Sequence, residues 1–108
     1  MTKDSDNFLE IIQGDTYYLR VSMSEDDIED VESVEWTSSD IGLDVELERH
    51  DLVNDDGTID YGYDITLSSD TTEDFEPMRT VYCITITYND ESIETGIYNG
   101  LMRIYSKE

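Results

Sequence analysis

The chain has 108 residues and a mass of 12.5 kDa, which is enough for one domain. Its 28 acidic and 6 basic residues give a formal net charge of −22. This charge argues against direct binding to nucleic acid or to anionic membranes, because both depend on Lys and Arg. Hydrophobic residues make up 37% of the chain and aromatic residues 10%, so we expect a folded core and not an intrinsically disordered chain.

The composition favours β-structure. The chain contains no alanine, the best helix former, but it has eleven Ile, six Val, eight Tyr and eleven Thr. Residues of these β-branched and aromatic types suit the pleated, half-buried surface of a sheet. The composition therefore predicts an all-β protein.

The first part of the chain reads as an arm followed by strands. Residues 1–7 are polar and are expected to form a flexible arm, and residues 8–108 a single β-sandwich domain. Structure is expected to begin at Phe8–Ile12, and alternating apolar residues predict a strand over Thr16–Met23. Residues 24–32 form an acidic connection with at most one helical turn, for which Ser24 is a candidate N-cap.

Two central segments continue this pattern. Val34–Ser38 is a short predicted strand, and Leu43–Glu48 alternates most cleanly, with apolar residues on one face and acidic residues on the other. Ile59–Leu67 is the next strand, interrupted at Gly62. The acidic residues that follow are expected to hold one helical turn around Thr71–Phe75.

The last part of the chain predicts three strands. Thr80–Tyr88 is apolar on both faces in places, as a central strand would be, and Ile93–Tyr98 and Leu101–Tyr105 follow it. Asn99–Gly100 is expected to form a tight two-residue turn between the last two. Seven to eight short strands at even spacing predict an antiparallel sandwich or small barrel.

Candidate catalytic groups are few. Cys83 is the only cysteine, so no intrachain disulfide can form, and its apolar surroundings predict a small buried side chain. The only histidine, His50, precedes Asp51, but neighbours on an extended chain point to opposite sides, so the two need not interact. We expect no enzymatic activity, no cofactor and no zinc site.

A turn rich in acidic residues raises the question of calcium. Asn54–Asp60 is similar to the centre of an EF-hand loop, but with Gly57 at the sixth position the first and twelfth ligands would be Leu52 and Tyr63. A plain turn is the simpler interpretation. Calcium binding by residues 51–60 stays open at this point.

The acidic residues themselves are the strongest functional signal. Side chains two apart on a strand are about 6.6–7 Å apart, so one predicted strand carries a row of carboxylates and the preceding connection carries a second patch. These surfaces could compete with DNA for a basic groove, although acids can also simply keep a protein soluble or adapt it to high salt. The row is Asp44, Glu46 and Glu48, and the patch is Asp26, Asp27, Glu29, Asp30, Glu32 and Glu35.

Short motifs resemble a family of phage proteins. Residues 11–16, Ile-Ile-Gln-Gly-Asp-Thr, followed by an alternating strand, resemble the opening of the amino-terminal domain of the phage baseplate upper protein family. Thr71–Glu73, Pro77, the strand Tyr82–Ile86 and the segment Ile97–Leu101 are similar to later parts of that domain. The resemblance spans residues 8–105 and implies an immunoglobulin-like β-sandwich and a structural or adaptor role in a phage particle, without catalytic residues. This chain is far more acidic than that pattern.

Two main hypotheses of function follow. In the first, the protein is a non-enzymatic structural or accessory protein of a phage virion, tail or head, and its partners are neighbouring virion subunits. In the alternative, it is an acidic DNA mimic of the anti-restriction or anti-CRISPR type, and its partner is a basic nucleic-acid-binding protein such as a defence nuclease. A calcium-loaded adhesin-like module is a third possibility. With neither a signal peptide nor a membrane span in the sequence, we expect the protein in the virion or the host cytoplasm, and an oligomer is compatible with this.

Overall fold

A computed structural model describes residues 8–107, so the predicted arm over residues 1–7 lies outside the described residues. The all-β prediction is confirmed, with eight strands in the described part of the chain. The elements are β1 (Phe8–Ile12), β2 (Tyr17–Met23), α2 (Glu25–Glu29), β3 (Val31–Ser38), the 3-10 turn η1 (Ser39–Ile41), β4 (Leu43–Arg49), β5 (Leu52–Val53), β6 (Ile59–Leu67), α3 (Ser69–Glu73), β7 (Met78–Tyr88) and β8 (Ile93–Tyr105).

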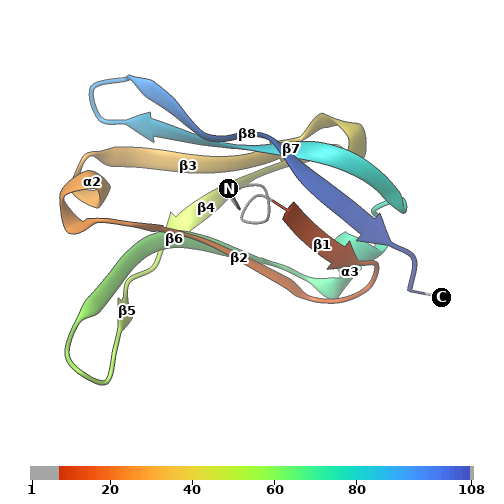
Figure 1. Ribbon diagram of the computed structural model, residues 1–108, viewed down its shortest axis with the longest axis horizontal. Helices are drawn as coiled ribbons and strands as arrows, with labels where there is room; N and C mark the ends of the chain where they lie inside the picture. The colour runs from red at the N-terminus through yellow and green to blue at the C-terminus, as the bar shows by residue number, and fades with distance from the viewer. Residues whose placement is uncertain (1–7, 108) are drawn as a thin grey trace, which may run out of the picture.

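The strands form one mixed sheet that is nearly barrel-shaped. Hydrogen-bonded neighbours follow the order β1-β8-β7-β3-β4-β6-β2, and β5 pairs with β6 outside this path. Figure 1 shows β3, β7 and β8 in one layer, β2 and β6 in the opposite layer, and β4 crossing between them. β7 lies between β8 and β3, which confirms its prediction as a central strand.

The expected all-antiparallel arrangement is wrong for one pair, because β1 runs parallel to β8. After β1 the chain turns at Gly14, where φ is +88°, and continues into β2 in the opposite layer. β1 therefore pairs with the last strand and not with its neighbour in sequence. The immunoglobulin-like sandwich stays a prediction.

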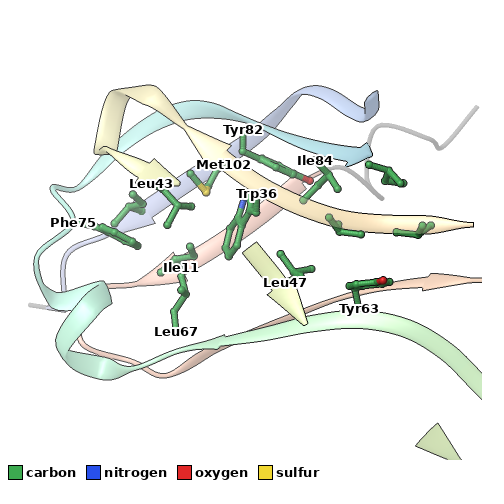
Figure 2. Packing of buried hydrophobic residues seen from close by; sticks show 14 of the residues in the cluster. Ile11, Trp36, Leu43, Leu47, Tyr63, Leu67, Phe75, Tyr82, Ile84 and Met102 are labelled. Atoms are coloured by element: carbon green, nitrogen blue, oxygen red, sulfur yellow. The ribbon is translucent and has the colours of Figure 1, made fainter. Parts of the chain in front are cut away.

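The core lies between the two layers around Trp36 (Figure 2). The indole of Trp36 is fully buried, and its ring centroid lies 6.1 Å from that of Tyr17 and 6.4 Å from that of Tyr82. Leu43 and Leu47 on β4 are also buried, as the alternation of that strand predicts. Burial of these large side chains is the main term that stabilises the fold.

Two short helical turns close the ends of the sheet. Ser24 caps α2, because its Oγ accepts a hydrogen bond from the backbone N–H of Asp27 at 3.1 Å, which confirms the predicted cap. The second turn, α3, begins two residues before the predicted segment and is capped in the same way by Ser68. Thr72 of α3 is buried, and its hydroxyl donates to the carbonyl of Asp15 at 2.6 Å, which ties α3 to the β1–β2 turn.

The predicted turn at Asn99–Gly100 is wrong. Both residues lie inside β8, which runs without interruption over 13 residues beside β7. Asn99 has the positive φ that a primed turn requires, at 56°, but Gly100 does not, so the chain bulges there and does not reverse. β7 is 11 residues long and pairs with both halves of β8, so sheet pairing outweighs the local turn signal.

Candidate interaction surface

The predicted acidic row lies on the outer face of β4. Asp44, Glu46 and Glu48 are exposed there, while the alternate residues Leu43 and Leu47 are buried. All nine acidic residues proposed from the sequence are exposed, including the six of the second patch.

Strand pairing changes how these acids are grouped. Glu35 on β3 is the cross-strand partner of Glu46 on β4, and Thr37 is the partner of Asp44. Glu35 therefore belongs to the β4 row and not to the patch with which the sequence grouped it. Like charges directly opposite one another destabilise a sheet, so this pair has a cost in the isolated chain. We call Glu35, Asp44, Glu46 and Glu48 the acidic face.

The remaining five predicted acids lie on or next to α2, at one end of the sheet. Ile28 turns its side chain into the core, and the acids around it face outward. Glu29 forms an ion pair with Arg49 at 3.7 Å. The nearby hydroxyl of Tyr88 donates a hydrogen bond to Glu94, and this bond, together with partial burial and neighbouring carboxylates, raises the pKa of Tyr88 to about 12. These five residues are Asp26, Asp27, Glu29, Asp30 and Glu32.

A polar cluster that we did not anticipate joins β2, β6 and the end of β4. The Oδ2 atom of Asp64 lies 2.9 Å from Nη1 of Arg20, 2.7 Å from the Tyr18 hydroxyl and 2.8 Å from Nδ1 of His50. Arg20 also donates hydrogen bonds to Asp60, from Nε to the Asp60 carboxylate at 3.3 Å and from Nη2 to the Asp60 backbone carbonyl at 2.7 Å. The side chains of Arg20 and Asp64 are only 11% and 12% exposed, so this ion pair is largely shielded from water.

His50 is exposed, and its partner is Asp64 and not its sequence neighbour Asp51, which pairs with Arg49. An ionised carboxylate can only accept hydrogen bonds, so Nδ1 of His50 carries the proton in this contact. Partial burial of Asp64 raises the pKa of its carboxyl, but the hydrogen bonds from Tyr18, His50 and Arg20 outweigh it and the net pKa is lowered.

Gly62 makes room for this cluster. A Cβ atom at this position would lie 2.6 Å from the carbonyl oxygen of Val21 and 2.9 Å from the guanidinium of Arg20. The signal in the sequence was the spacing of Asp60, Gly62 and Asp64, which are two apart and share one face of a strand. The predicted interruption at Gly62 is wrong, because β6 continues through this residue.

The Asn54–Asp60 turn is held by hydrogen bonds among its own residues. Asp56 accepts hydrogen bonds from the backbone N–H and the hydroxyl of Thr58, at 3.0 and 2.7 Å, as in an Asx turn. Among residues 8–107, no group of three His, Cys, Asp or Glu side chains is placed to hold a metal ion. Cys83 is only partly buried, contrary to expectation, because its neighbours Tyr82 and Ile84 take the inward positions of β7.

The outer face of β1, β8 and β7 differs from the acidic face. Phe8, Leu101 and Val81 are aligned across these three strands and are 43%, 56% and 40% exposed. The next outward row contains Arg103 beside Arg79. We call these five residues, together with Tyr105, the apolar–basic face.

Comparisons with family models, curated proteins and solved structures find no match to this chain. Within the described range, no helix has the length and apolar character needed to cross a membrane.

Proposed function

We propose that the protein is a non-enzymatic module that acts by protein–protein contact, as a structural or accessory component of a phage particle. The observation that supports contact most directly is the exposed row of Phe8, Leu101 and Val81. These residues occupy aligned positions on adjacent hydrogen-bonded strands, so they form a continuous apolar patch on an otherwise acidic chain. Exposed apolar patches of this kind mark protein interaction sites.

Replacing Val81 and Leu101 together with serine is expected to reduce co-purification with phage particles by about tenfold or more, because buried apolar anchors dominate interface energies. The matched control is Val53→Ser/Ile59→Ser. These two residues are also exposed, apolar and paired across strands, but they lie on the β5–β6 hairpin. Equal co-purification of the wild type and both double variants would contradict the proposed role of this row.

The DNA-mimic alternative is favoured by a different observation, the acidic face. Glu35, Asp44, Glu46 and Glu48 place four carboxylates on two adjacent strands. None of them forms an ion pair with another described residue, so their charge is free to act on a basic partner. Such a surface would steer a basic nuclease towards the sheet and compete with its DNA substrate.

Under this alternative, Glu46→Lys/Glu48→Lys abolishes competition with duplex DNA for a basic defence nuclease. Binding by the wild type weakens steeply between low and moderate salt, because exposed charges are screened. Asp55→Lys/Glu76→Lys is the control, since it makes the same charge change at two exposed loop positions. Competition that survives in both double variants would count against the mimic, as would virion association that is independent of Glu46 and Glu48.

A further inference from the structure

Two arginines on the apolar–basic face lie directly opposite each other. Arg79 on β7 is the cross-strand partner of Arg103 on β8. Like charges in this arrangement destabilise an isolated sheet. Arg103 also has an acidic cross-strand partner, Glu10 on β1, whereas Arg79 has none. The three side chains leave a net positive charge on this row, which an anion from outside the chain would balance.

The ion pairs of the protein support this view. Within residues 8–107 the chain has five Lys and Arg side chains, and Arg20, Arg49 and Lys107 each form an ion pair. Arg79 and Arg103 form none with the described residues. Among the described Lys and Arg residues, Arg79 and Arg103 are therefore the two that could form an ion pair with a partner.

One carboxylate on this face, that of Glu10, is hydrogen-bonded to Tyr105. Glu10 on β1 is the cross-strand partner of Arg103, but its Oε2 accepts a hydrogen bond from the Tyr105 hydroxyl at 2.7 Å. The guanidinium of Arg103 lies over the ring of the same Tyr105, 4.8 Å from its centroid. Tyr105 thereby contacts both Glu10 and Arg103, while Arg79 forms no ion pair with a described residue.

A hollow of about 350 Å³ adjoins the two arginines. Its volume falls in the range of sites that accept a ligand group or an anchor side chain. The walls are both apolar and basic, so the hollow fits an apolar group next to a negative charge. Phe8, Arg79, Thr80, Leu101, Met102, Arg103 and Tyr105 line it.

We infer that the apolar–basic face docks a segment of another protein in which a carboxylate stands next to an apolar side chain. The apolar side chain occupies the hollow beside Phe8 and Leu101, and the carboxylate binds between Arg79 and Arg103. A second copy of this chain fits less well, because two chains of −22 repel each other. At physiological salt, charges more than about 8 Å away are screened, so the two arginines govern the contact with a short segment.

This inference rests on the proposed contact function and names the chemistry of the partner. The probe is the capped peptide acetyl-Gly-Leu-Asp-Leu-Asp-Gly-amide, titrated into 15N-labelled full-length protein and followed by NMR. We expect shifts confined to the amides of Phe8, Arg79, Leu101, Arg103 and their neighbours, with a dissociation constant of about 1 mM or tighter. The same peptide with Asn in place of Asp should bind at least about tenfold more weakly.

Arg79→Gln/Arg103→Gln should abolish these shifts. Arg49→Gln/Lys107→Gln, which removes the same charge elsewhere, should preserve them. The inference is overturned if the wild type shows no shift with the Asp peptide, or if the Asn peptide binds equally well. Shifts of the same amides on concentrating the protein without peptide would assign the face to a second copy and also overturn it.

The two levels of the proposal can fail separately. If Val81→Ser/Leu101→Ser loses particle association while the peptide does not bind, the contact function stands and only the carboxylate chemistry is wrong. If the peptide binds but neither serine variant changes particle association, the docking face stands and its role in a particle is wrong.

Discussion

Replacing Gly100 with alanine is expected to lower the free energy of unfolding by about 3 kcal/mol, because the new methyl group has no space. A Cβ atom here would lie 2.6 and 2.7 Å from two ring carbons of Tyr82 and 2.9 Å from Cγ2 of Ile97. Tyr82 is fully buried against Trp36, so its ring cannot swing away. The φ of Gly100 is not positive, so the cause is this close approach and not backbone strain.

Thermal and urea unfolding measure this effect, and a fall in Tm of about 15 °C is expected. Gly96→Ala on the same strand is the matched control, because its Cβ would meet its nearest atom at 3.6 Å, an ordinary contact. Tyr82→Leu removes the ring carbons that clash, so the double variant Gly100→Ala/Tyr82→Leu should cost less than the sum of the two single changes. Equal stability of the Gly96 and Gly100 variants would show that Tyr82 does not restrict this position.

The strands whose faces differ most in polarity were predicted best from the sequence. Ile59–Leu67 has the bounds of β6, and the alternation of β4 was predicted with the correct buried face. The prediction of a turn at Asn99–Gly100 is wrong, because the positive φ of Asn99 occurs in a bulge as well as in a turn. The parallel pairing of β1 with β8 joins the two ends of the chain, and no periodicity within either strand encodes it.

For the surface residues, the sequence predicts exposure but not which side chains from different strands lie side by side. Exposure of the nine acids follows from alternation and polarity, and the structure has all of them exposed. The position of Glu35 opposite Glu46 depends on the register between β3 and β4, which alternation within one strand does not specify. The Arg79–Arg103 pair likewise depends on the register of β7 on β8, which shifts at two irregularities between the β7–β8 turn and this pair.

The register of β3 on β4 and of β7 on β8 places charges of the same sign opposite each other, which the composition alone does not reveal. The sheet carries a like-charge pair of acids, Glu35 and Glu46, and a like-charge pair of bases, Arg79 and Arg103, on different pairs of strands. Each pair has a cost in the free protein that a partner of opposite charge would remove. The acidic face has the same sign of charge as the whole chain, whose net charge is −22, whereas the face that we propose for docking carries two arginines.

The Asp64 cluster is expected to make part of the stability depend on pH. Its lowered pKa means that the folded protein binds this proton more weakly than the unfolded chain. The carboxylate therefore stabilises the fold fully at pH values above about 4, near the unfolded pKa. This contribution is lost as the pH falls through the lower folded-state value and Asp64 becomes protonated.

Asp64→Asn is accordingly expected to cost about 2 kcal/mol at pH 7, because it removes the charged acceptor of hydrogen bonds from Arg20, Tyr18 and His50. The difference from wild type should shrink progressively as the pH falls below about 4, as measured by urea unfolding across the acid range. Asp55→Asn removes the same charge from an exposed loop position and corrects for the lower overall repulsion. A difference between the Asp64 variant and wild type that stayed constant with pH would mean that the cluster holds β2, β4 and β6 together by shape and not by the ionised carboxylate.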